Sequence, residues 1–191
     1  MRVIILAVPG AGKSTILRMI SEKVKDVKLV NFGDLMFEEA KKLGISNRDE
    51  MRKKLSLDSY RAIQISAAKN IASMEGNVII DTHASIETPE GFYPGLPIDL
   101  VKEMKPDIIV LLEFNPRVIA ERRKGDKTRT TRDMEGEEEI ALHQAINRVY
   151  ATIASASTMA KLKIIRLIWE EKREFEHSEY ASNEIAKLFS S

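Results

Sequence analysis

The feature that most restricts how this chain can fold is the segment AVPGAGKST at residues 7–15. It follows the apolar run VIIL and precedes ILRMI, so a strand is predicted to end where a helix begins. Apart from Ala7, which stands where the pattern has glycine, the segment matches the phosphate-binding pattern GxxxxGK[ST]. In that pattern the backbone amides at the start of a helix surround a phosphate group. The sequence therefore predicts an α/β fold with a nucleotide-binding loop.

The polar residues of the loop have separate expected roles. Lys13 is expected to reach the β- and γ-phosphates, Ser14 to bind Mg²⁺ through its hydroxyl, and Thr15 to donate to the α-phosphate. Ala7 is tolerated if its backbone is extended, because only a positive φ would require glycine. The strand–loop–helix context argues against the alternative, a plain helix start capped by Ser14. The predicted ATP-binding residues are Val8, Pro9, Gly10, Ala11, Gly12, Lys13, Ser14 and Thr15.

Short β-branched runs alternate with helical patterns along the chain. Continuous apolar runs are typical of strands that a parallel sheet buries on both faces. The predicted strands are RVIILAV (2–8), VKLVNF (27–32), NVIID (77–81), DIIVLLEF (107–114) and LKIIRLIW (162–169). Apolar helix stripes are predicted at Ile16, Leu17, Ile20 and Val24, and at Ile146, Val149, Tyr150 and Ile153. The alternation predicts an α/β fold, a parallel sheet flanked by helices.

Two intervals are longer than a simple connection between strands needs. Residues 33–76 read as two helices joined by a loop, and residues 121–139 have Met134 as their only large apolar residue. We expect both to be mobile insertions over a sheet edge, in a single domain whose core is 1–32, 77–120 and 140–191. The turn-rich residues 87–97 are predicted to form an ordered loop.

Composition removes several classes of function. The chain has 30 basic and 29 acidic residues, a formal charge of +1, and no cysteine. Disulfide scaffolds, zinc ribbons and thiol nucleophiles are excluded, and no overall charge favours nucleic acid or an anionic membrane. Without a signal-peptide pattern or a long apolar stretch, a cytoplasmic protein with no nucleic-acid or membrane partner is expected.

Other polar residues are placed to complete a phosphate site. Asp81 ends the predicted strand 77–81, where it can hold Mg²⁺ largely through water, although a turn aspartate is the alternative. His83 can contact substrate or be structural. Transfer of a phosphoryl group between two nucleotides requires several guanidinium groups. Arg122, Arg123, Arg129 and Arg132 supply them within residues 121–139, unless that segment is only a charged surface, and Arg148 can point into a cleft.

Taken together, these motifs resemble the archaeal-type adenylate kinases. The resemblance rests on AVPGAGKST, NFGDLMFEEA, NRDEMRKK, DTHASIETPEGFYPGLP, GDKTRTTRD and HQAINR, in order from residue 3 to about residue 165. It implies a parallel five-stranded sheet, an insertion that binds the nucleoside monophosphate at about 33–76 and a lid at about 121–139. It also implies the reaction ATP + AMP ⇌ 2 ADP with Mg²⁺, and a homo-oligomer that is often a trimer.

The resemblance also implies site residues. On the AMP side they are Asn31, Gly33, Asp34, Met36, Arg52, Arg61, His83 and Gly95. The residues implied to close on the transferred phosphoryl group are Arg123, Arg129, Arg132 and Arg148, which together with Lys13 are the predicted catalytic residues. The lid sequence TRTTRD is one residue longer than the family's TRNRD, which leaves open which of Arg129 and Arg132 takes each role. DTHAS lacks the arginine of the bacterial DGFPR motif, so Arg52 or Arg61 must bind the AMP phosphate instead.

Three other functions stay open from the residues themselves. The acceptor can be another nucleoside monophosphate, because base selection depends on a few contacts. A nucleotide-operated switch or assembly ATPase would use the loop without the arginine lid. RNA contact through the basic segment would show a steep salt dependence. Trp169 is predicted to be a core residue, with a subunit contact as the alternative.

Overall fold

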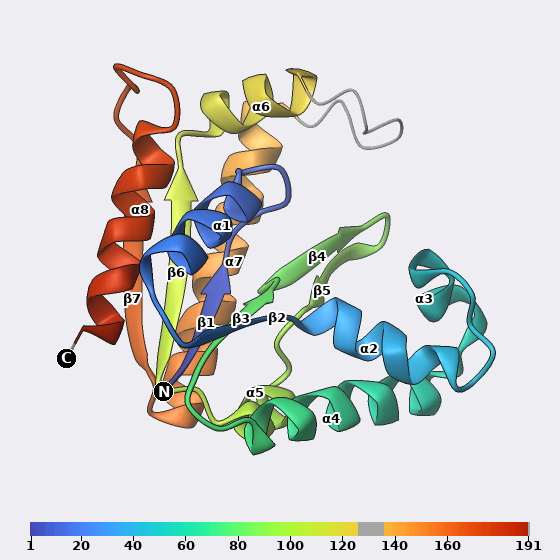
Figure 1. Cartoon of the computed structure of the whole chain (residues 1–191). Coiled ribbons are helices and arrows are strands. Elements are labelled where there is room, and N and C mark those ends of the chain that lie inside the picture. Colours follow the sequence, from blue (N-terminus) through green and yellow to red (C-terminus); the bar gives the residue numbers. More distant parts are fainter. Residues whose placement is uncertain (126–135, 191) are drawn as a thin grey trace.

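A five-stranded parallel sheet carries the fold in the computed structural model, which describes residues 1–125 and 136–190 (Figure 1). The strands are β1 (Arg2–Leu6), β2 (Val27–Asn31), β3 (Asn77–Thr82), β6 (Ile108–Phe114) and β7 (Lys161–Leu167). They lie in the order β2-β3-β1-β6-β7, and every neighbouring pair is parallel. This arrangement confirms the predicted sheet and all five of its predicted strands.

The order of the strands fixes where a ligand can bind. β1 is central, and its neighbours β3 and β6 are not its neighbours in sequence. After β1 the chain forms β2 and β3 on one side of it, and then crosses over to form β6 and β7 on the other side. In such sheets ligands bind beyond the carboxyl ends of the strands where the order reverses. The segment after β1 and the end of β3 therefore lie at the expected binding position.

Both faces of the sheet are covered by helices, which explains the uninterrupted apolar strands. Ile4 and Leu6 of β1 pack into one apolar cluster, whereas Val3 and Ile5 pack into the other. The helices are α1 (Lys13–Lys23), α2 (Phe32–Lys41), α3 (Met51–Lys54), α4 (Leu57–Ser73), α5 (Ile98–Met104), α6 (Pro116–Gly125), α7 (Glu137–Thr158) and α8 (Glu176–Ala186), with short 3₁₀ turns η1 (Arg48–Glu50) and η2 (Lys187–Phe189). The first predicted stripe is confirmed, because Ile16, Leu17 and Ile20 of α1 are buried.

Residues 33–76 form a helical arm that shares the main core. The arm comprises α2, η1, α3 and α4, and it extends away from the β2 edge of the sheet (Figure 1). Asn31 caps α2, because its side-chain oxygen accepts from the backbone amide of Asp34 at 3.0 Å. Met36 and Ile63 join the same apolar cluster as Ile4 of β1. The division into core, monophosphate-binding insertion and lid stays a prediction.

Residues 85–94 form a β-hairpin, so the loop predicted at 87–97 is wrong for most of its length. β4 (Ser85–Thr88) and β5 (Gly91–Pro94) are antiparallel partners. Polar residues and prolines in such short strands hide the pattern by which a strand is recognised. Gly95 then lets the chain pass close to the link between β3 and β4, since a Cβ at this position would lie 2.1 Å from the carbonyl oxygen of His83.

The second predicted helix stripe, Ile146, Val149, Tyr150 and Ile153, does not form the buried face of its helix. Val149 and Ile153 of α7 are 54% and 42% exposed. The buried face of α7 instead carries small and polar residues: His143, Asn147, Ala151 and Ala154. Asn147 packs against the hairpin, where Ser85 Oγ donates to its Oδ1 at 2.6 Å, and Ala151 and Ala154 join the main apolar cluster. An apolar stripe therefore remains on the surface of α7.

The remaining predictions concern the end of the chain and the interval 121–139. Residues 121–125 complete α6 and residues 137–139 begin α7, whereas Arg129 and Arg132 lie outside the described residues. Trp169 packs on the apolar cluster of α1 and α8 and meets the His177 ring edge-to-face at 4.8 Å. Among the described helices, none has the length and apolar character needed to cross a membrane.

Candidate active site

The loop after β1 has the backbone of a phosphate-binding loop. Gly10 and Gly12 have φ values of +82° and +94°, a conformation that side chains with a Cβ rarely adopt. Gly12 is the residue immediately before α1, so the loop amides lead into the start of a helix. Ala7 is buried and is not among the residues with positive φ, which explains why alanine is accepted there.

Lys13 and Asp81 form an ion pair at the carboxyl ends of β1 and β3. Lys13 Nζ lies 2.6 Å from Asp81 Oδ1 and also donates to the carbonyl oxygen of Thr82. Burial lowers the pKa of Lys13, and the charge of Asp81 opposes that shift. Asn31 Nδ2 donates to the other Asp81 oxygen at 2.8 Å. One carboxylate therefore connects the phosphate loop to Asn31, which ends β2 and caps the first helix of the helical arm.

Two arginines of α6 hold the carbonyl side of the phosphate loop. Arg122 Nη1 donates to the carbonyl of Ala11 at 2.6 Å, and its Nη2 lies 3.0 Å from Glu171. Arg123 is 8% exposed and donates to the carbonyl of Pro9 from Nε and Nη2. With carbonyls bound on this side, and with the amides of Ala11 and Thr15 donating to the carbonyls of Val8 and Gly12, the loop is held in its shape. The predicted catalytic residue Arg123 thus lies against the loop.

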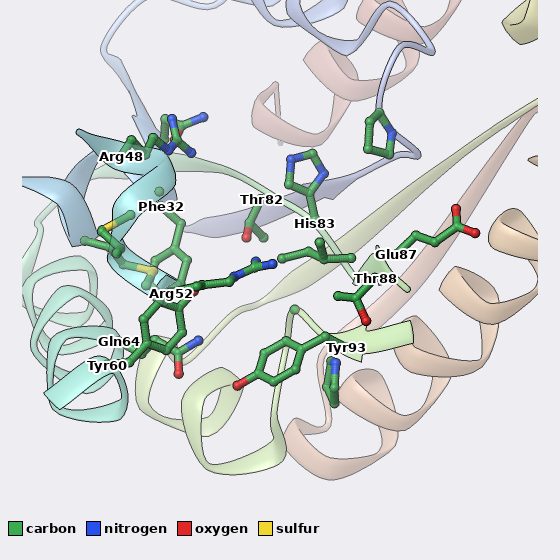
Figure 2. Close-up of a pocket in the computed structure, with 18 of the residues that line it drawn as sticks. Phe32, Arg48, Arg52, Tyr60, Gln64, Thr82, His83, Glu87, Thr88 and Tyr93 are labelled. Atoms are coloured by element: carbon green, nitrogen blue, oxygen red, sulfur yellow. The ribbon is translucent and has the colours of Figure 1, made fainter. Parts of the chain in front are cut away.

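A cavity of about 770 Å³ lies between the loop, the helical arm and the hairpin (Figure 2). Its lining mixes cationic, aromatic and apolar side chains with the Asp81 carboxylate, as is typical of a site that binds an anionic ligand with a flat apolar part. Predicted residues that line it are Pro9, Asn31, Gly33, Met36, Arg52, Asp81, His83 and Gly95. The structure therefore brings most of the predicted AMP-side residues together around one cavity.

Two predicted AMP-side residues lie outside this lining. Arg61 is an exposed residue of α4, and Asp34 is exposed and accepts from Arg48 Nη1 at 2.8 Å. Arg48 itself lines the cavity, and its Nη2 donates to Asn31 at 3.3 Å. Sequence reasoning missed it because NRDE lies in a segment with no clear periodicity. Gly33 leaves room for this arginine, since a Cβ there would lie 1.7 Å from Arg48 Nη2.

Other lining residues were also missed. They come from α4 and from the hairpin, and they include Tyr60, Gln64, Glu87 and Tyr93. The sequence signal for Gln64 is a single amide within the otherwise apolar stripe of α4. The sequence of the hairpin gave no such signal for Glu87 and Tyr93. Residues 87–97 were predicted to form a loop, and a loop has no buried stripe in which a polar residue would stand out.

Arg148 is held by a buried carboxylate at the end of β6. Its Nε donates to Glu113 Oε1 at 2.7 Å, and its Nη2 donates to the other oxygen. These bonds raise the pKa of Arg148 above its ordinary value. Arg166 on β7 adds a second cation 3.7 Å from Glu113. Arg148 does not line the cavity, and its neighbour Gln144 bonds to the backbone of Phe114.

Two solved structures of shikimate kinases share this fold. The shikimate kinase of Bacteroides thetaiotaomicron is 19% identical and superposes with a TM-score of 0.61 over 100% of this chain and 99% of its own. The enzyme from Aquifex aeolicus is 18% identical, with a TM-score of 0.56 over 100% of this chain and 96% of its own. At this identity the likeness shows the shared fold.

The parallel sheet, the glycine loop and the cavity beside Lys13 define a P-loop kinase. Residues 6–141 match the family described as AAA domain. The chain is 50% identical to the adenylate kinase of Pyrobaculum aerophilum, over 98% of this chain and 96% of that protein. It is 45% identical to the adenylate kinase of Pyrococcus horikoshii, over 97% of this chain and 93% of that protein. The chain therefore belongs to the adenylate kinase family.

The cavity makes one histidine sensitive to pH. Burial, followed by the charge of Lys13, lowers the pKa of His83 from 6.5 to about 4. As pH falls below 6.5, the unfolded chain takes up a proton at this residue before the folded protein does. The contribution of neutral His83 to the free energy of unfolding is therefore fully present above pH 6.5. It decreases by up to about 3 kcal/mol as the pH falls to about 4.

Denaturant unfolding of the wild type and of His83→Asn between pH 7 and pH 4 measures this effect. The free energy of unfolding of the wild type should fall more steeply than that of the variant. Parallel curves for the two proteins would show that His83 is not held neutral by its surroundings.

Proposed function

We propose that this protein transfers a phosphoryl group reversibly between ATP and AMP, forming two ADP, and so balances adenine nucleotides. The observation that carries the proposal is the position of Lys13 and Asp81 between two binding regions. The phosphate loop lies on one side, and the cavity with Arg48 and Arg52 lies on the other. A phosphate bound at the loop and a phosphate bound in the cavity would then face each other across this pair.

The chain's residues would act mainly by positioning and by charge. The amides of Gly10 to Thr15 would hold the ATP phosphates, with the Lys13 ammonium on the β- and γ-phosphates. Arg48 and Arg52 are the cavity's arginines and would orient the AMP phosphate for in-line attack. That phosphate is already an anionic nucleophile, so no general base is required. Exclusion of water prevents hydrolysis in place of transfer.

The predicted catalytic arginines fit this scheme to different degrees. Arg123 lies against the phosphate loop through Pro9 and is close to the phosphates that the loop would bind. Arg148 would have to exchange Glu113 for a phosphate oxygen in order to act on the transferred group. Arg129 and Arg132 remain proposed partners of the same phosphates on the basis of the family resemblance.

The site fits a magnesium ion that is bound together with nucleotide phosphates. Among the described residues no three His, Cys, Asp or Glu side chains form a metal cluster. Mg²⁺ does not require one, because it keeps several waters and adds one or two protein oxygens to those of the phosphates. The exposed Ser14 hydroxyl and the Asp81 carboxylate supply such oxygens. When bound there, Mg²⁺ would screen the phosphate charge during transfer.

We also propose that the protein is a cytoplasmic homo-oligomer, and a trimer in keeping with the family it resembles. The surface of α7 supports association. Leu142, Val149 and Ile153 are 55%, 54% and 42% exposed, and with the half-buried Ile146 they form one stripe at i, i+4, i+7 and i+11. An exposed apolar stripe of this length is typical of a protein contact. We call it the α7 stripe.

Initial rates of ADP formation from ATP with AMP, CMP, UMP or GMP, with and without Mg²⁺, test the function. AMP with Mg²⁺ should give the highest rate. Lys13→Ala should lower kcat by about 100-fold or more, because one preorganised charge contact to the phosphates is lost. Arg18→Ala is the matched control, since Arg18 is exposed on α1 and pairs only with Glu22 among the described residues. ATP hydrolysis without AMP-dependent ADP formation would favour a nucleotide switch instead.

Light scattering of the purified protein tests the oligomer. The measured mass should correspond to three copies of the 21.6 kDa chain. Val149→Glu should reduce it to one copy, because burying an unpaired charge in the α7 stripe is unfavourable. Asn70→Glu, an equal charge change at an exposed site of α4, should leave the assembly intact. A monomeric wild type, or an intact Val149→Glu oligomer, would contradict this use of the α7 stripe.

A further inference from the structure

A carboxylate lies on a face of β6 where the other residues are buried and apolar. Ile109, Leu111 and Glu113 alternate along the strand, so they point to the same side of the sheet. Ile109 and Leu111 pack there in the apolar cluster that contains Ala151 and Ala154 of α7. The side chain of Glu113 is only 9% exposed. A carboxylate in such a place destabilises the fold unless cations stay beside it.

Two arginines from different elements neutralise this carboxylate. Arg148 of α7 binds it with Nε and Nη2, one bond to each oxygen. Arg166 is the neighbour of Glu113 in the parallel pairing of β6 with β7, and its Nε lies 3.7 Å from Glu113 Oε2. Within residues 1–125 and 136–190, no other Lys, Arg or His lies within ion-pair distance of Glu113.

The two arginines differ in how they are held beside Glu113. The register of the sheet keeps Arg166 next to it, whereas Arg148 reaches it from a separate helix. The Arg166 side chain is 60% exposed, and its 3.7 Å contact is longer than a hydrogen bond. Its guanidinium therefore has room to move closer to the carboxylate.

This difference matters for the proposed transfer, in which Arg148 leaves Glu113 for a phosphate oxygen. Its departure alone would leave a buried carboxylate without the cation that binds it, which is strongly unfavourable. The unfavourable free energy would be added to the barrier of the transfer step. A second cation that stays beside Glu113 would lower that barrier.

We propose that Arg166 is a positioning residue, which takes over Glu113 when Arg148 turns to the transferred phosphoryl group. The inference rests on the proposed function, and in particular on the role of Arg148 in it. Arg166 touches no phosphate itself and acts through Glu113. The exchange keeps the buried carboxylate neutralised and frees the charge of Arg148 for the phosphates. It also explains why the sheet places a cation next to a carboxylate that already has a bidentate partner.

Arg166→Gln tests the proposal by removing the second cation. Its kcat should fall about tenfold, the size expected for one partly exposed charge contact. KM for ATP and for AMP should change by less than about twofold, because the contact matters only once Arg148 has moved. The free energy of unfolding should stay close to that of the wild type, because Arg148 still neutralises Glu113 in the free protein. An arginine with a structural role alone would lower stability and leave kcat unchanged.

Two further variants serve as controls. Arg166→Lys keeps a cation beside Glu113 and should retain most of the wild-type kcat. Lys161→Gln removes an exposed cation from the same strand and should leave kcat unchanged. Loss of kcat in Lys161→Gln equal to that in Arg166→Gln would contradict a role specific to Arg166.

The decisive comparison is made in Glu113→Gln, which lacks the charge that Arg166 takes over. In this background Arg166→Gln should change kcat by less than about twofold. An undiminished loss there, or no loss in the wild-type background, would overturn the proposal. If Arg148→Ala also retains the wild-type kcat, the proposed role of Arg148 fails as well. A low kcat in Arg148→Ala beside full activity in Arg166→Gln contradicts this inference alone.

A second measurement needs no variant. In a crystal structure with P¹,P⁵-di(adenosine-5′) pentaphosphate bound, Arg148 should lie on phosphate oxygens and Arg166 should donate to Glu113. Arg148 on the phosphates with Arg166 away from Glu113 would overturn the inference. Arg148 still bonded to Glu113 would overturn it together with the proposed role of Arg148.

Discussion

The ion pair between Lys13 and Asp81 is the interaction on which the rest of the site depends. It joins the carboxyl ends of two neighbouring strands, β1 and β3, at the point where the strand order reverses. The lysine begins helix α1 and so follows the glycine loop, whereas the aspartate reaches Asn31 at the start of the helical arm. A phosphate that draws the ammonium away from Asp81 would therefore act on both nucleotide regions at once. This coupling is electrostatic and local. Because the whole chain has a formal charge of only +1, its overall charge would contribute little to binding the phosphates.

Separate elements around this ion pair stabilise the phosphate loop, form the cavity and hold Arg148. α6 binds the carbonyls of the phosphate loop through Arg122 and Arg123, and thereby stabilises a backbone that contains two glycines with positive φ. The helical arm and the hairpin form the cavity on the other side of the pair. Glu113 at the end of β6 holds Arg148 outside that cavity. Phosphoryl transfer by charge and position alone needs such an arrangement, in which cations are placed before the substrates arrive.

The sequence predicted the parts of the structure that have a strong local cause. Continuous β-branched runs define the five strands, and the glycine loop defines the phosphate site at the end of β1. The hairpin was missed because the prolines and polar residues of its short strands, which pair with each other and contact α7 through Ser85, do not give an alternating apolar pattern. On α7 the apolar residues at Val149 and Ile153 face outward, since alanines and Asn147 allow closer packing on the inward face. The cavity residue Arg48 could not be predicted, because a single arginine has no periodic signal, and the only signal for Gln64 was one amide within the apolar stripe of α4.

A crystal structure with P¹,P⁵-di(adenosine-5′) pentaphosphate bound is the most direct test of the central claim, because this molecule contains both nucleotides and the phosphates between them. The account predicts one adenosine on the phosphate-loop side and the other in the cavity, with Lys13 Nζ bonded to phosphate oxygens instead of Asp81. A complex in which Lys13 stays on Asp81, or in which the second adenosine lies outside the cavity, would contradict it.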